Sequence, residues 1–320
     1  MTEDNVVKPL SELQPAGGHE FSSLTPPTSS AGSPDSCPTP RADVVSVSTT
    51  FFPGSTIEPT QPDSIIVSAD SVFFYGHSHV LAKSTNRFDS LLPDSPAEGV
   101  AMEHLPILSL PEPSEVVNVL LHAIYNMPCA HYSPSFETVS AVVDILPKYG
   151  LDVKTLCASG FSLFNLLVTY APIRPMDVYC LAGYHDLLDL AIATSPYLLS
   201  FPLPTITDEM AEKMGARYLK RLFFMHLGRA DALKRLLLQP PVAHVPSPIC
   251  DIADQRRLTR AWALASAYIA WDARPNLTGA EIQTSLTPLA DGLECAQCKL
   301  SLRERISTLI AQWSAVKSTI

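Results

Sequence analysis

The chain has 320 residues, of which 46% are hydrophobic, and its net charge is −10. This length allows one large or two ordinary domains, and the hydrophobic content is sufficient for a buried core. The acidic balance disfavours a protein that binds nucleic acid or a membrane surface without specificity. The first residues lack the basic and apolar regions of a signal peptide. Seven cysteines, an odd number, favour free thiols in a reducing compartment, so we expect a cytoplasmic and/or nuclear protein.

Residues 1–60 are rich in Pro, Ser and Thr and show little apolar periodicity. Such a segment cannot bury enough apolar surface to offset the entropy that ordering removes. We therefore expect a disordered tail over these residues. Within it, Val44–Val47 is the one stretch that we expect to add an edge strand to a neighbouring sheet.

The segment from residue 63 to residue 92 changes its hydrophobic period half-way. Two β-rich runs, Ser64–Val67 and Val72–Tyr75, flank a short polar turn, which predicts a β-hairpin. The following residues recur at steps of three and four and so share one helical face: His77, Leu81, Thr85, Phe88 and Leu92. The segment therefore predicts a tight hairpin followed directly by a buried helical pair.

The rest of the chain has the periodicity of helices. Two amphipathic stripes predict core-facing helices near residues 117–124 and 136–146. Thr155–Ile173 contains no charged residue, but its polar residues and lack of flanking basic clusters favour a protein interior over a membrane. Four helical segments are expected beyond residue 160: Met176–Ala193, Asp208–Leu238 with a break near Gly228, Arg256–Trp271 and Leu300–Lys317.

Nothing in the sequence predicts an enzyme. Gly-x-Ser-x-Gly, the phosphate-binding loop and Gly-x-Gly-x-x-Gly are all absent, and the thirteen glycines are dispersed. Basic residues do recur between residues 213 and 260, where they form either a nucleic-acid face or a solvated helix face. No DNA-reading module accompanies them, so we favour the solvated face and expect no direct binding of nucleic acid.

Cys295-x-x-Cys298 is the strongest chemical signal, because this spacing lets two thiolates bind one Zn²⁺. A closed structural site needs four ligands, and Cys250 and His244, in a Pro-rich stretch, are the candidates for the other two. The alternative is that these thiols pack the start of a helix without a metal. From the sequence alone we favour thiol packing and predict no cofactor.

The middle third of the chain resembles a BTB/POZ domain. The motif residues in order are Asp63, then His-x-x-x-Leu-x-x-x-Ser/Thr-x-x-Phe from His77 to Phe88, and Lys-Tyr-x-Leu at residues 148–151. Leu105–Leu110 resembles the third strand of the family and Glu115–Tyr125 the helix that ends in Tyr. The whole chain looks most like basidiomycete fungal BTB proteins, which have a helical second half and a late Cys-x-x-Cys.

The resemblance implies protein–protein interaction, usually with self-association through the first helical segment. It points to an interface around five residues, Asp63, Ser78, Val80, Leu91 and Leu92, the last three of which we expect to add exposed apolar surface. In repressor-type members an Arg stands at the position of Ser78, so this chain lacks one interaction of the corepressor pocket. Some relatives recruit substrates to cullin-type ubiquitin ligases and others act in transcription.

These observations predict an α+β protein of three parts: a tail (1–60), a BTB/POZ domain (61–160) and an all-α C-terminal domain (161–320). We expect a non-enzymatic adaptor that forms a homodimer, binds an unidentified protein, for example a cullin-type scaffold, and does not contact membranes. The competing hypothesis is a zinc-dependent or otherwise unrecognised enzyme in the helical half. A cleft lined by perturbed polar groups in residues 160–320 would favour the enzyme.

Overall fold

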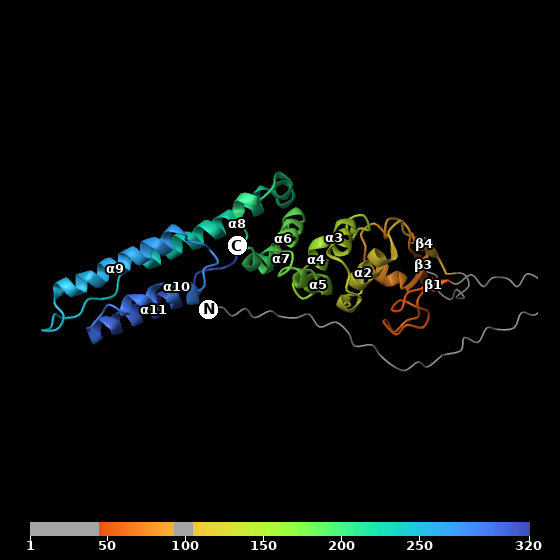
Figure 1. Cartoon of the computed structure of the whole chain (residues 1–320). Helices are drawn as coiled ribbons and strands as arrows, with labels where there is room; N and C mark the ends of the chain where they lie inside the picture. Colours follow the sequence, from red (N-terminus) through yellow and green to blue (C-terminus); the bar gives the residue numbers. More distant parts are fainter. Residues whose placement is uncertain (1–44, 93–104) are drawn as a thin grey trace, which may run out of the picture. The chain divides into compact units, whose positions relative to one another are not determined.

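The computed structural model describes residues 45–92 and 105–320 (Figure 1). A small mixed sheet lies in the N-terminal part of this region, and the remainder is mostly helical, so the predicted α+β class is confirmed. The tail is predicted over residues 1–60, and its residues 1–44 lie outside the described part of the chain.

The sheet has four strands in the order β1-β3-β2-β4. Strands β2 (Ser64–Val67) and β3 (Val72–Gly76) form the antiparallel hairpin that the sequence predicts, while β1 (Ser46–Val47) and β4 (Ile107–Ser109) pair in parallel at the two edges. Ile66 and Phe74 face each other across the hairpin, and both are buried. The strand expected at Val44–Val47 is thus present as β1.

The predicted tail extends too far toward the sheet. Residues 45–60 belong to the folded part, because the Phe51 side chain is only 1% exposed and packs against three aromatic rings. Those rings belong to Phe74 of β3 and to His122 and Tyr125 near the end of α2 (Ser114–Ile124). The Pro- and Ser-rich composition of the segment predicted disorder, although one large aromatic side chain, that of Phe51, packs in the core.

The helical pair predicted after the hairpin is wrong beyond its first turn. Helix α1 (Ser78–Leu81) has four residues, and turns follow it to residue 92. Residues 87–90 have positive φ angles between 54° and 62°, which is the left-handed region and incompatible with a continuing α-helix. Leu81 and Phe88 are nevertheless fully buried as the periodicity predicts, and the Phe88 ring stacks on Tyr149 at 4.5 Å between centroids.

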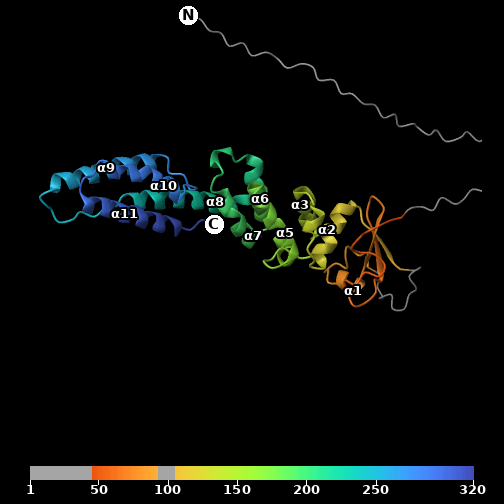
Figure 2. The ribbon, with the colours of Figure 1, turned by 60° about the horizontal axis from the view of Figure 1, so that its bottom comes forward.

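Helices make up most of the remaining chain, and Figure 2 shows α8, α9, α10 and α11 running side by side. None of the helices in the described residues is long and apolar enough to cross a membrane, and the uncharged stretch is divided between α4 and α5. The bounds are α3 (Phe136–Ile145), α4 (Val153–Leu156), α5 (Ser162–Tyr170), α6 (Pro175–Tyr184), α7 (Leu188–Thr194), α8 (Asp208–Leu237), α9 (Ile252–Trp271), α10 (Gly279–Leu286) and α11 (Ala296–Ser314).

Helix α8 is interrupted at a different glycine from the one expected. Its backbone is helical through Gly228 and leaves the helical region at Gly215, where φ is 71° and ψ is 159°. The backbone of the preceding residue, Met214, lies against Gly183 of α6, and a Cβ on Gly183 would come within 2.5 Å of the Met214 carbonyl oxygen. Close helix contact therefore accompanies the break, and this tertiary feature has no local sequence signature.

The described residues form two hydrophobic clusters, which we call the sheet cluster and the C-terminal cluster. The sheet cluster runs from Phe51 to Met225 and includes α2, α3, α5, α6 and α7. The C-terminal cluster runs from Leu233 to Trp313 and includes α9, α10 and α11. The predicted domain boundary at residue 160 is therefore not a packing boundary, because helices on both sides of it share one core. Helix α8 contributes side chains to both clusters.

Candidate metal centre

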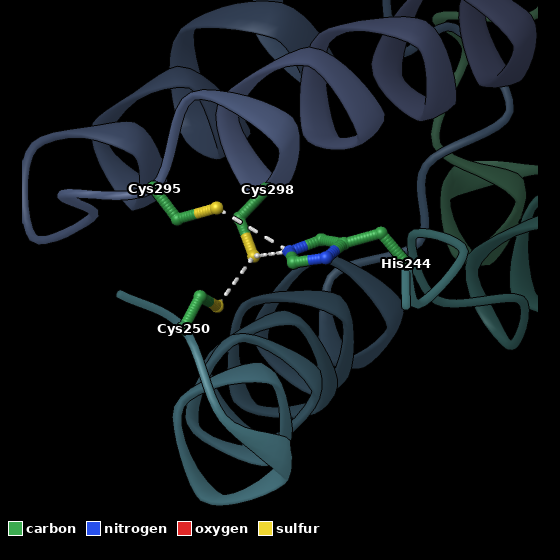
Figure 3. Close-up of side chains that lie close together, drawn as sticks. All are labelled: His244, Cys250, Cys295 and Cys298. Atoms are coloured by element: carbon green, nitrogen blue, oxygen red, sulfur yellow. Dashed lines mark hydrogen bonds between the residues drawn. The ribbon is translucent and has the colours of Figure 1, made fainter. Parts of the chain in front are cut away.

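Four candidate ligands come from two separate segments at the C-terminal cluster (Figure 3). His244 and Cys250 lie on the loop between α8 and α9. The prolines of this loop restrict their own backbone angles and those of the residues that directly precede them. Cys295 is the N-cap residue of α11, and Cys298 lies in the first turn of that helix. The helix start thus presents two thiols on one side, and the proline-rich loop brings the other two ligands to them.

The four ligand atoms, His244 Nε2 and three Sγ atoms, all lie within 4.8 Å of one another. His244 Nε2 is 3.2 Å from Cys298 Sγ and 3.3 Å from Cys295 Sγ, and Cys250 Sγ is 3.6 Å from Cys298 Sγ. A tetrahedral zinc ion with ordinary bond lengths separates two sulfur ligands by about 3.8 Å and a sulfur from a nitrogen by about 3.5 Å. The ligand atoms therefore already stand close to the spacing that Zn²⁺ requires.

The His244 ring is oriented for metal binding by its other nitrogen. Nδ1 lies 2.8 Å from the backbone carbonyl oxygen of Val245, which accepts a hydrogen bond and so holds the proton on Nδ1. The lone pair of Nε2 is then free and points at the thiols. This is the tautomer that metal-binding histidines use, with a carbonyl fixing the non-ligating nitrogen.

The electrostatics of the three thiols differ. Backbone N–H groups at the start of α11, chiefly that of Cys298, lower the pKa of Cys295 to about 7, which favours its thiolate. Burial and the neighbouring thiols raise the pKa of Cys250 to about 12, and burial also raises the pKa of Cys298. In the absence of a cation the site therefore favours one thiolate, and a bound divalent cation would deprotonate all three thiols.

The loop that carries His244 is tied to α11 at further points. Ser301 Oγ donates a hydrogen bond of 2.7 Å to the Val242 carbonyl oxygen, and the buried Arg305 guanidinium donates to the carbonyl oxygens of Leu236 and Gln239. These bonds satisfy carbonyl groups at the end of α8, where a helix leaves its last carbonyls without partners. The loop and the end of α8 are thus joined to α11 by these hydrogen bonds in addition to the four candidate ligands.

All four zinc candidates that the sequence names are brought together, although the sequence alone favoured thiol packing. The preference changes because of His244. Packed thiols would need only apolar neighbours, whereas here an imidazole nitrogen is aimed at two sulfur atoms. Among the described residues this is the one group of three or more His, Cys, Asp or Glu side chains with a geometry that could hold a metal ion.

The residues expected at a BTB-type interface are arranged differently from the prediction. Asp63 accepts hydrogen bonds from the backbone N–H of Ser78, at 2.6 Å, and from the Ser78 hydroxyl. Val80 and Leu92 are 1% and 8% exposed within the single chain, and Leu91 is 38% exposed. The expected exposed apolar surface is therefore wrong for Val80 and Leu92, because the chain after the single turn of α1 folds both side chains into the sheet cluster.

Other residues of the BTB resemblance contact one another or the residues that flank the motif segments. The ring of His77 lies between the Tyr125 hydroxyl, 2.9 Å from Nδ1, and the Thr60 carbonyl oxygen, 3.0 Å from Nε2. Glu112 accepts hydrogen bonds from the ammonium group of Lys148, at 2.6 Å, and from the Tyr149 hydroxyl. These contacts link segments of the motif that are distant in sequence.

No protein-family model matches the chain, and neither a curated protein nor a solved structure matches it. The resemblance to BTB/POZ domains therefore stays a prediction.

Proposed function

We propose that this chain is a non-enzymatic protein–protein interaction protein, or adaptor, whose C-terminal helices are held together by a structural zinc ion. The observation that carries the proposal is the closed set of three Cys and one His. Four protein ligands complete the tetrahedral coordination of Zn²⁺, as in structural sites, whereas catalytic zinc keeps one position for water or substrate. The role of the ion is then to join the loop of His244 and Cys250 to the start of α11.

The sheet cluster supplies the interaction part of the proposal. A hairpin followed by a short helix, with Asp63 bonded to Ser78 and His77 bonded to Tyr125, is compatible with the BTB/POZ fold that residues 63–151 resemble. We propose self-association through this part, as the resemblance implies. Both edge strands add exposed apolar side chains, with Val47 on β1 and Ile107 on β4 exposed by 39% and 63%.

The enzyme hypothesis has less support from the helical half. One hollow of this half, about 730 Å³, lies between the end of α9 and α10. The charged groups lining it pair with one another, since Arg274 forms ion pairs with Asp272 at 3.2 Å and Glu281 at 3.6 Å. The three candidate cysteines line a separate hollow of about 210 Å³, but all four candidate ligands there are protein side chains, which leaves no coordination position for a substrate.

Elemental analysis of the full chain, purified without chelator, tests the zinc component. We expect one zinc per chain, lost in Cys298→Ser and retained in Cys180→Ser. Cys180 is a suitable control because it is a buried thiol in the sheet cluster, outside the site, and its donation to the Met210 carbonyl oxygen can be reproduced by a hydroxyl. Wild-type protein that is folded and free of zinc, even after zinc is added, would overturn the proposal.

Light scattering of the full chain over a concentration series tests self-association. A dimer that is weakened by Leu91→Asp but not by Ile173→Asp would support an interface near α1, since both side chains are exposed and Ile173 lies between α5 and α6. Val80→Asp is unsuitable, because its buried position would unfold the chain. A chain that stays monomeric at tens of micromolar, where weak contacts of roughly 6–7 kcal/mol begin to populate, would remove self-association from the proposal.

A further inference from the structure

A surface groove separates the outer faces of α8 and α9. The two helices lie side by side, and Trp262 Nε1 donates a hydrogen bond of 3.0 Å to the Leu237 carbonyl oxygen (Figures 1 and 2). The groove has a volume of about 230 Å³ and is lined mainly by small and apolar side chains, among them Ala263, Ala267 and Leu238. Alanine at these positions leaves room for another backbone to approach closely, because the distance between packed helices is set by the side chains at their contact.

The lining also contains a polar group without a partner. Ser266 lies on the groove side of α9 and is 7% exposed, and its hydroxyl has no hydrogen-bond partner among the described residues. The oxygen is shielded from solvent, so Ser266 contributes a small side chain rather than a polar contact to the groove surface.

Charge is strongly segregated along the chain, and the groove lies in its basic part. Residues 45–212 include 18 acidic and 5 basic residues, a net charge of −13. Residues 213–260 include 3 acidic and 10 basic residues, a net charge of +7. A basic hairpin within an acidic protein indicates a surface that attracts an acidic partner.

The cations of this basic part are divided between structural contacts and the groove. Arg217 pairs with Asp186, and Arg229 points into the C-terminal cluster, where it donates to the Pro275 and Val316 carbonyl oxygens. By contrast, four exposed cations of the two helices form no ion pair within the described part of the chain, and the first of them lines the groove: Lys234 and Arg235 on α8 and Arg256 and Arg260 on α9.

The register of α9 places its cations in line with the groove floor. Arg256, Arg260, Ala263 and Ala267 follow one another at steps of four, three and four residues, so they share one face of the helix. Lys234 lines the opposite wall, on α8. The result is a mainly apolar floor with Lys234 on one side and the α9 cations continuing its line toward the start of α9.

We propose that the groove between α8 and α9 binds an amphipathic helix of a partner protein, with an apolar face on the alanine floor and acidic side chains facing Lys234 and the α9 cations Arg256 and Arg260. This inference rests on the proposed function, since it names the class of partner that the adaptor binds. Helices commonly bind in such grooves through apolar anchors at three- and four-residue steps. A nucleic acid fits less well, because its phosphates need cations and donors across the contact surface, and the lining here is mainly alanine and leucine with a single cation, Lys234.

The test is selection of a phage-displayed library of random helical peptides on the full, zinc-loaded chain. We expect enriched peptides with apolar residues at three- and four-residue steps and Asp or Glu flanking them. Fluorescence anisotropy with the most enriched peptide then gives its Kd for wild type and variants. Ala267→Gln fills the floor without a change of charge and should weaken binding by at least about tenfold, while Ala311→Gln, at an exposed alanine of α11, should not.

A charge reversal provides the second arm. Arg260→Glu should weaken binding of the same peptide by about tenfold or more, whereas Arg303→Glu, an equal reversal on α11, should leave it unchanged. Enriched peptides without acidic residues, equal binding by the Ala267→Gln variant, or no enrichment would overturn the inference. Tighter binding of an oligonucleotide that Arg260→Glu abolishes, or a dimer that Ala267→Gln dissociates, would replace the partner helix by another occupant.

Failure of this inference and failure of the proposed function give different results. A chain with one zinc that self-associates but enriches no helix contradicts the groove alone. A chain without zinc whose groove still binds an acidic helix contradicts the structural zinc and leaves the partner class standing.

Discussion

Removal of the proposed zinc ion should lower the free energy of unfolding of the C-terminal cluster by several kcal/mol. A ligand that binds only the folded state stabilises it by RT ln(1 + [L]/Kd), which is about 4.1 kcal/mol when free zinc exceeds Kd about 1,000-fold. The site supports a high affinity, because its four ligand atoms already lie within 4.8 Å and the His244 tautomer is fixed by Val245. At roughly 2–4 °C per kcal/mol for a domain of this size, the thermal midpoint should fall by about 8–16 °C.

The assay is thermal unfolding followed by circular dichroism, with and without a zinc chelator, together with hydrogen exchange of the apo protein. Exchange should accelerate first in residues 240–250 and at the start of α11, which the metal joins, and last in α6 and α7 of the sheet cluster. Cys298→Ser should melt at the lower temperature and show no response to chelator. A wild-type midpoint that does not move after elemental analysis shows complete loss of zinc would refute the structural role of the ion.

Three further changes test the rest of the fold by urea denaturation. Phe88→Ala should destabilise by about 3–5 kcal/mol because the ring is fully buried, and Phe224→Ala, at a ring that is 64% exposed, by less than about 1 kcal/mol; equal effects would contradict the assigned core. Hydrogen bonds from Ser114 and Ser68 lower the pKa of Asp70 from 3.8 to about 2, so its contribution to stability is present above pH 4 and is lost as the pH falls toward 2. The difference between wild type and Asp70→Asn should therefore be largest at neutral pH and vanish near pH 2, and a pH-independent difference would exclude this linkage. Arg229→Met removes the donor to three backbone carbonyl oxygens and should cost about 2 kcal/mol or more, whereas a neutral effect would show that desolvation of the cation already cancels those bonds.

Local features of the sheet cluster could be predicted from the sequence because they depend on neighbouring residues. The alternation in residues 64–67 and 72–75 specified the hairpin, and the three- and four-residue steps identified Leu81 and Phe88 as buried. The same steps do not require a helix. In residues 87–90 the backbone is left-handed, yet the Phe88 side chain still reaches the core. The turns of this segment are joined to the rest of the chain where the Thr85 backbone N–H donates to the Gly150 carbonyl oxygen.

Features that depend on distant contacts could not be read in this way. The predicted boundary at residue 160 follows a change from strands to helices, but Leu163 and Tyr179 share their core with Phe51 and Phe74. The sequence alone could not decide between a metal centre and packed thiols for a similar reason. Cys250 and Cys298 are separated by two helices, so their proximity depends on the lengths and packing of α9 and α10, which no spacing motif encodes.

Because α8 supplies side chains to both clusters, the chain has no position between them where it can be cut without damage. Met214, Tyr218 and Leu222 belong to the sheet cluster, and Leu233 and Leu237, about three and four helical turns beyond Leu222 in the same helix, belong to the C-terminal cluster. A truncation before residue 208 would remove the α8 side chains that pack in the sheet cluster. A cut near residue 226 would separate the α8 segments that pack in the two clusters and would expose apolar surface in both. Recombination that exchanges either half for a foreign module would have to replace α8 as well, so the two halves are inherited as one piece.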